Sequence, residues 1–392
     1  MTVDPTHPAL RYFPLVARPR PAAKALDVRI DDLCALADRA NRENDLAAAS
    51  AVYNQAALIA SDCGQAVLAR QWCHDHADAY LRALPLGAQA ARHALEPLVN
   101  LARLHIRDGN GDAALDLLND LFRAVSSRTD ALIDGFPLPA IRLTRSEDDH
   151  REVRQWLWSV LLADGARALT SARRWQEAYE HLQRHNGIGQ RMLDGRQVAV
   201  IARATAGDIE RARTMIADTT LGEAWEEAVT ACLALLCAHA AGETAEAYLD
   251  PLISSYRRLP SIPHLAVFHT RLGLAIIDAV GGVDHPSARR VAAGLVQRAR
   301  NLDDTYVVRD LLRHAEVLTV IDPRYTAKLV ESLRAHGPTD QGTPLATHRQ
   351  LVQSLAISRA VIQNVGQPHR RSDAEIRLRE GAPDLSAGSS CN

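Results

Sequence analysis

Apolar side chains recur along most of the chain with the spacing of amphipathic helices. The stretch from Leu98 to Leu121 shows this spacing clearly, because two apolar stripes flank a Gly-Asn turn. The first stripe occupies positions i, i+3, i+4 and i+7, and the second occupies i, i+4 and i+7. Since this period matches the 3.6 residues of a helical turn, the stretch predicts two short helices that pack against each other.

The same pattern predicts helices along nearly the whole chain, with turns at Gly, Asn, Asp or Pro. Strands would need aromatic and β-branched residues, whereas aromatics make up 4% of this chain and Ala and Leu abound. We therefore expect an all-α protein with about 15–17 helices. Besides two helices between about 87 and 121, they span 27–43, 46–61, 65–84, 148–171, 175–185, 188–206, 209–217, 222–241, 244–258, 265–280, 287–301, 303–321, 324–335 and 344–364.

A turn that is followed five positions later by Ala recurs at a regular interval. The copies start at Asn44, Gly109, Arg173, Gly207 and Gly242, in steps of 65, 64, 34 and 35 residues. Two weaker copies start at Val283 and Asp322. Because the first two steps are close to twice the later ones, the underlying unit is about 34 residues, which is the length of one helix pair.

Over residues 27–336 the chain resembles the tetratricopeptide-repeat family. The residues that match the small and large packing positions of its helix pairs are Ala49, Tyr53 and Ala56 in a second helix, and Leu33, Leu36, Ala37 and Ala40 in a first helix. The resemblance implies an α-solenoid, in which paired antiparallel helices stack into a right-handed superhelix. An irregular helical bundle is the alternative.

Three segments depart from the repeat, which otherwise predicts a single domain over residues 27–365. Residues 1–26 hold five prolines and the apolar residues Leu10, Tyr12, Phe13 and Leu15, which predicts an arm that caps the first repeat or docks on a partner. Residues 126–147 lose the helical period and predict an irregular loop. Residues 366–392 are polar without an apolar face and predict a disordered tail.

In tetratricopeptide superhelices the first helices of successive pairs line a concave face, and the resemblance carries this face onto this chain. Its polar half would hold the partner-binding residues Asp38, Asn41, Arg42, Arg103, Arg107, Arg167, Asp194 and Gln197. Its apolar half would hold Val229, Cys232, Leu236, Ile277 and Val280. Such a surface suits an extended or helical peptide with acidic and apolar anchors.

Charge and cysteine content narrow the classes of function. The formal net charge is −2, so no general positive field favours binding of nucleic acid by this chain itself. No apolar run reaches the ~18 residues of a membrane-spanning helix. Six cysteines without a CxxC pair are typical of reduced thiols, which predicts a cytoplasmic protein.

Three clusters contain residue types that could carry chemistry, and each lacks the rest of its motif. Glu177, His181 and His185 share a helix face, but zinc would need a further ligand. Residues 73–76 read Cys-His-Asp-His without a second such cluster, and the acids at 148–152 suit the start of a helix. We therefore expect no catalytic residue, no metal and no cofactor.

These observations favour a non-enzymatic adaptor or regulatory protein that binds a protein or peptide segment on the concave face. The alternative is an enzyme or accessory factor in peptide or natural-product modification. An ordered 126–147 loop that folds over the face and holds Arg142, Arg145 and Asp149 near Arg103 would favour that alternative, and a loop splayed into solvent would favour the adaptor. A third expectation is self-assembly of the repeat into a homodimer.

Overall fold

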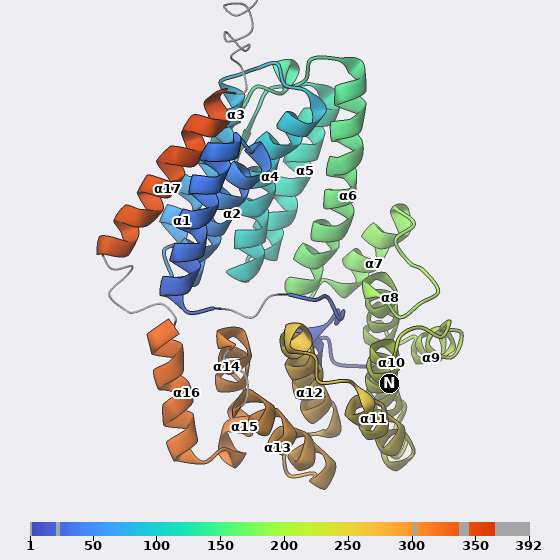
Figure 1. Cartoon of the computed structure of the whole chain (residues 1–392). Coiled ribbons are helices and arrows are strands. Elements are labelled where there is room, and N and C mark those ends of the chain that lie inside the picture. The colour runs from blue at the N-terminus through green and yellow to red at the C-terminus, as the bar shows by residue number, and fades with distance from the viewer. Residues whose placement is uncertain (1, 21–23, 301–303, 337–344, 365–392) are drawn as a thin grey trace, which may run out of the picture.

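The computed structural model describes residues 2–20, 24–300, 304–336 and 345–364. These ranges hold seventeen α-helices and one two-stranded hairpin, which confirms the predicted all-α class (Figure 1). None of the helices in these ranges combines the length and the apolar character that crossing a membrane requires. The predicted tail at 366–392 lies outside the described residues.

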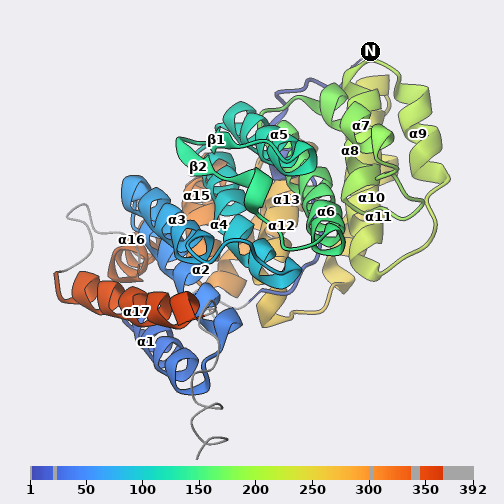
Figure 2. The same ribbon diagram turned by 90° about the horizontal axis from the view of Figure 1, so that it is seen from above.

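Seven helices share one hydrophobic core, and we call them the first helix group. They are α1 (Leu26–Glu43), α2 (Leu46–Asp62), α3 (Ala66–Leu81), α4 (Ala88–Arg107), α5 (Gly111–Ser127), α6 (Glu147–Ser171) and α17 (Leu345–Gln363). Helix α17 packs along α1 and α2, and both views show it beside α1 (Figures 1 and 2). The last described helix therefore packs beside the first α-helix.

The other helices surround a second core, together with residues from the N-terminal arm, and we call them the second helix group. They are α7 (Trp175–Arg184), α8 (Asp194–Thr205), α9 (Ile209–Ala217), α10 (Ala224–Ala241), α11 (Glu246–Arg258), α12 (Ala266–Val280), α13 (Pro286–Arg300), α14 (Thr305–Leu312), α15 (Ala315–Val320) and α16 (Pro323–His336). The 3-10 helices η1 (Pro8–Tyr12) and η3 (Pro263–Leu265) also belong here. Helix α6 connects the two groups, because its end packs on α7.

The helices alternate between two layers along much of the chain. Each helix from α1 to α10 packs on the next one, and α4 also contacts α2 and α6. In the second group, α10 contacts α8 and α12, and α12 contacts α14. We call α4, α6, α8, α10, α12 and α14 the even helices. Small side chains such as Ala37 and Ala102, both fully buried, allow this close packing.

The ends of the helices follow local turn chemistry, with two departures from the predicted ranges. Asn44 and Gly242 adopt left-handed backbone and end α1 and α10, as their positions in the repeat predict. The helix predicted from residue 188 begins only at Asp194, because the backbone stays irregular after α7. The predicted 303–321 helix is wrong as a single element, since it breaks at Arg313 and His314 caps α15.

The segment predicted as an irregular loop, 126–147, is ordered. It contains the hairpin of β1 (Ala131–Ile133) and β2 (Phe136–Leu138), followed by the 3-10 helix η2 (Ala140–Arg142). Two backbone hydrogen bonds fix it to the α3–α4 connection, from Leu86 N to Leu143 O and from Arg145 N to Leu86 O, each 2.9 Å. The missing helical period thus marks a hairpin, whose second strand contains Pro137 and is followed directly by Pro139.

Replacing Gly111 by Ala is expected to lower the free energy of unfolding by about 2 kcal/mol, as overpacking does. Gly111 opens α5 and is buried, and a Cβ there would overlap the Ala168 carbonyl oxygen of α6. Urea denaturation measures the loss. Gly294→Ala is the control, because no atom lies near its Cβ within α13, and it is expected to stabilise slightly. Equal effects of both changes would contradict the close approach of α5 and α6.

Candidate peptide-binding face

The N-terminal arm lies against the second helix group, where its apolar side chains are buried. Val3, Ala9, Leu10, Phe13 and Leu15 are each at most 5% exposed and belong to the second core. Apart from η1 the arm forms no helix, as four prolines within residues 2–20 dictate. η1 packs on α12, so the arm docks on the second group and does not cap the first repeat.

A fully buried glutamine of α8 forms hydrogen bonds to the backbone of the arm. The side-chain oxygen of Gln197 accepts a hydrogen bond from Leu15 N at 2.7 Å. Its amide nitrogen donates to Leu15 O at 2.7 Å and to Met192 O at 3.0 Å. Gln197 therefore satisfies both backbone groups of one arm residue, as a neighbouring strand would. This contact recognises an extended backbone and does not depend on the side chain of the bound residue.

Further polar contacts hold the arm at both ends and in the middle. Val3 N donates to Ala204 O of α8 at 3.0 Å, and Arg20 N donates to His264 O of η3 at 2.9 Å. Two ion pairs join the arm to α8 and α12, Arg18 with Asp194 at 2.7 Å and Arg11 with Asp278 at 3.2 Å. We call the surface made by Asp194, Gln197, Ala204, His264 and Asp278 the arm-binding face.

The apolar residues predicted for the second half of the concave face are covered. Val229, Cys232, Leu236 and Ile277 are buried in the same core as the arm's side chains, and Val280 packs against that core. Burial raises the pKa of the Cys232 thiol to about 12, so this cysteine is a neutral apolar group rather than a nucleophile. The structure therefore places these residues inside the second core and not on an open face.

The eight residues predicted to bind a partner fall in separate places. Asp194 and Gln197 both contact the arm, as described above. Asp38, Asn41 and Arg42 are exposed on α1. This helix packs on α2 and α17, and it is not one of the helices from α4 to α14 that we call the even helices. The structure therefore does not bring these three residues together with the others.

The three predicted arginines already have acidic neighbours inside the chain. Arg103 donates to the buried Asp164 at 2.9 and 3.0 Å, and Arg167 donates to the other oxygen of that carboxylate at 2.8 Å. Arg107 binds Asp62, at the end of α2. The prediction that these side chains are free for an acidic partner missed both carboxylates. The packing of α4 on α6 and α2 brings Asp164 to Arg103 and Asp62 to Arg107, whereas Asp164 and Arg167 lie three residues apart on α6.

Sequence reasoning also missed Asp278, which lies between two predicted apolar positions of α12. Its side chain is only 6% exposed, and it accepts a hydrogen bond from His314 at 3.0 Å besides the ion pair with Arg11. A lone acid in the apolar run of α12 was the available signal, since buried carboxylates need partners.

The arrangement that would favour the enzyme alternative, with Arg145 and Asp149 near Arg103, is not found among these residues. Asp149 accepts a hydrogen bond from Ala88 N at 2.8 Å, and Arg145 donates to Pro85 O at 3.1 Å, so both lie at the start of α4. Arg103 lies fifteen residues further along that helix, about 22 Å away at 1.5 Å per residue. The ordered 126–147 segment therefore does not place these side chains beside Arg103.

The residues of the three clusters that could have carried chemistry make structural contacts instead. His181 bonds to Leu161 O at 3.1 Å, and His185 accepts from the Trp158 indole at 3.2 Å. Cys73 is buried, and its neighbour His76 stacks on Tyr53. Within the described residues no group of three or more His, Cys, Asp or Glu side chains could hold a metal ion.

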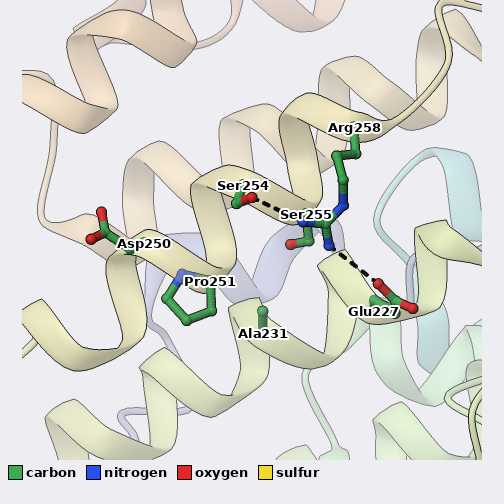
Figure 3. A pocket seen from close by; sticks show the side chains of 7 residues that line it. All are labelled: Glu227, Ala231, Asp250, Pro251, Ser254, Ser255 and Arg258. Carbon is green, nitrogen blue, oxygen red and sulfur yellow. Dashed lines mark hydrogen bonds and ion pairs between the residues drawn. The ribbon is translucent and has the colours of Figure 1, made fainter.

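A shallow hollow lies between α10 and α11 (Figure 3). Its lining residues are Glu227, Ala231, Asp250, Pro251, Ser254, Ser255 and Arg258. Arg258 reaches Ser254 at 2.9 Å and Glu227 at 3.4 Å, so its charge is partly matched inside the hollow. Because this lining lacks a histidine or cysteine, and its charged side chains are exposed, the hollow does not resemble a catalytic site.

No family model matches the chain, and comparisons with curated proteins and with solved structures also find no match.

Replacing Gln197 by Leu is expected to release the arm without unfolding the helices. The change removes both hydrogen bonds to Leu15 and leaves buried backbone groups unpaired, at a cost of about 2 kcal/mol. Trypsin should then cleave after Arg11, which Tyr12 follows, at least tenfold faster than in the parent chain. Gln183→Leu, on the exposed side of α7, is the matched control. Cleavage at the parent rate would show that Gln197 does not hold the arm.

Proposed function

We propose that this chain is a non-enzymatic adaptor or regulatory protein of tetratricopeptide-like architecture, which binds an extended segment of a partner on its arm-binding face. The alternation of helices between two layers supports the α-solenoid, because it is the arrangement that stacked helix pairs produce. The five cysteines of the described residues form no disulfide among themselves, which fits a cytoplasmic location.

The docked arm is the observation that carries the proposal. It is a peptide-like segment with buried apolar anchors, and one of its residues is recognised through its backbone. Extended-peptide recognition elsewhere uses this combination, since main-chain hydrogen bonds give affinity and side-chain pockets give specificity. A partner segment with apolar anchors followed by a basic residue would make the same contacts, including the ion pair to Asp194.

In this proposal the arm is an internal ligand that a partner displaces. A tethered segment competes at an effective concentration in the millimolar range, so only a tighter or more abundant partner would replace it. The arm then sets the affinity threshold for binding.

The test is to empty the face in the full chain and to offer the arm in trans. The variant carries Leu10→Ala, Phe13→Ala and Leu15→Ala, and the probe is a fluorescent synthetic peptide of residues 2–20. Fluorescence anisotropy is expected to show micromolar binding to this variant and at least 100-fold weaker binding to the parent chain, whose face is occupied.

Two controls make the result specific. Adding Gln197→Leu to the triple variant should abolish binding, and a scrambled peptide of the same composition should not bind. Circular dichroism establishes that each variant keeps its helix content. Absence of binding to the folded triple variant, or equal binding to the parent chain, would refute the proposed function.

A further inference from the structure

A second cluster of charged side chains lies where α14 meets the ends of three helices of the first group. We call Arg20, Arg29, Asp62, Arg107, Tyr306 and Arg309 the junction cluster. Arg29 lies in the first turn of α1, Asp62 ends α2, and Arg107 ends α4. Tyr306 and Arg309 belong to α14, and Arg20 ends the described part of the arm.

Asp62 is the single carboxylate of the cluster, and both of its oxygens are used. Arg29 donates to Oδ2 at 2.8 Å, the Tyr306 hydroxyl donates to the same oxygen at 2.9 Å, and Arg107 donates to Oδ1. Burial raises the pKa of this carboxyl, but the guanidiniums of Arg107 and Arg29 outweigh burial and hold it below its usual value. Asp62 is therefore ionised and already saturated with donors.

The other two arginines of the cluster, Arg20 and Arg309, stack on the Tyr306 ring and are not paired with a carboxylate of the described residues. The Cζ of Arg20 lies 4.1 Å from the centre of the Tyr306 ring, and the Cζ of Arg309 lies 4.8 Å from it. Neither side chain forms an ion pair within the described ranges. The Nε of Arg309 is buried without a hydrogen-bond partner there, although buried polar atoms nearly always have one.

Nearby groups leave the positive charge in excess. The charges of Arg313 and Asp310 also act on Arg309, and Asp310 is bound by Arg271 at 2.7 Å. Around Tyr306 there are thus six guanidiniums and three carboxylates, since Asp304 accepts from Tyr306 N at 2.9 Å, and all three carboxylates are engaged. Clustered guanidiniums repel one another, and an added anion relieves that repulsion. The exposed side-chain fractions of Arg107 and Arg29, 33% and 20%, leave the cluster accessible to a small ion.

We propose that the junction cluster binds an oxyanion of the phosphate class, with Arg309 and Arg20 as its main ligands and Arg107 at its edge. A guanidinium presents two parallel N–H groups to a phosphate, and arginines on different elements can surround one phosphate group. This site is separate from the arm-binding face, and the proposal does not depend on peptide binding there. The phosphate can be a free ion or a group carried on a peptide.

Isothermal titration calorimetry at constant ionic strength tests the proposal on the full chain. The probes are inorganic pyrophosphate, inorganic phosphate and N-acetyl-phosphoserine amide. The parent chain is expected to bind pyrophosphate with a submillimolar Kd, and Arg309→Met is expected to weaken binding at least tenfold. Arg211→Met is the matched control, because Arg211 is exposed on α9 and forms no ion pair within the described ranges.

A change at Asp62 should act in the opposite direction. Asp62→Asn keeps an acceptor for the Tyr306 hydroxyl but removes the competing negative charge, so pyrophosphate should bind at least threefold tighter. If melting shows that Arg309→Met does not fold, Arg20→Met removes the other main ligand and is expected to weaken binding to a similar degree.

The outcomes distinguish the two sources of the phosphate, and they also test whether the site exists. Binding of phosphoserine amide as tight as that of phosphate assigns the site to a peptide-borne phosphate, and binding of the inorganic ions alone assigns it to a free ion. The absence of saturable binding to the parent chain overturns the proposal. Equal affinity in the parent chain and in folded Arg309→Met or Arg20→Met also overturns it.

Discussion

Replacing Asp62 by Ala is expected to lower the free energy of unfolding by about 3 kcal/mol. The carboxylate is 11% exposed and receives hydrogen bonds from Arg29, Arg107 and Tyr306, so its removal leaves two guanidiniums facing each other without a counter-charge. Breaking a largely buried ion pair by removing one partner costs about 3–5 kcal/mol, and the partial exposure of the arginines favours the lower value. Urea denaturation monitored by circular dichroism measures the change.

The control for this substitution is Asp38→Ala, at an exposed position of α1 whose side chain forms no hydrogen bond or ion pair with the described part of the chain. It is expected to leave the unfolding midpoint unchanged. If Asp62→Ala is no more destabilising than Asp38→Ala, Asp62 does not join α14 to the first helix group. An oxyanion at the junction cluster predicts in addition that phosphate restores part of the lost stability, since a ligand of the folded state stabilises by mass action.

The second large effect is a loss of stability on acidification, caused by His76. The ring stacks on Tyr53, with 4.8 Å between centres, and neither ring nitrogen has a hydrogen-bond partner among the described residues. Burial lowers the pKa of His76 to about 3. In the unfolded chain the imidazole takes up a proton below about pH 6.5, whereas in the folded chain it stays neutral down to about pH 3.

The unfolded state therefore binds more protons in this window, and stability falls as the pH falls from about 6.5 towards 3. The contribution is about 1.4 kcal/mol per pH unit, which amounts to about 2–3 kcal/mol at pH 4.5. Urea denaturation between pH 7 and 4.5 gives the slope for the parent chain and for His76→Phe, which keeps the ring stacking.

We expect His76→Phe to flatten this slope and to be neutral or stabilising at pH 7, because it removes two unpaired nitrogens. Burial also lowers the pKa of His269, to about 4, so part of the slope should remain. His264→Phe, at an exposed position, controls for the substitution itself. An unchanged slope in His76→Phe would show that His76 is solvated in the folded protein.

Local patterns in the sequence predicted most of the helices because caps and turns are short-range features. Asp45 caps α2 by accepting from Ala47 N and Ala48 N, and Asn44 supplies the left-handed turn before it. The start of α8 was missed for a longer-range reason. Gly195 lies against the carbonyl of Gly187, so the chain must pass irregularly through residues 188–193 before the helix can begin.

The candidate site was only partly predictable, because its two sides are far apart in the sequence. The inward positions of the repeat pointed to Gln197 and Asp194, and the apolar residues between prolines pointed to an arm that needs a docking surface. No local pattern connects Leu15 with Gln197, which lie 182 positions apart. The same limit hid the pairs of Arg103 with Asp164 and of Arg107 with Asp62, which form only because α6 and α2 pack on α4.

Hydrogen exchange of the arm in the intact protein tests the central claim most directly. Mass spectrometry would follow the amides of residues 9–16, which include the Leu15 N–H bound by Gln197. We expect them to exchange at least 100-fold more slowly than in the free peptide of residues 2–20, and to speed up when excess peptide is added. Exchange at the rate of the free peptide would contradict the account, because the arm would then not occupy the face on which partner binding is proposed.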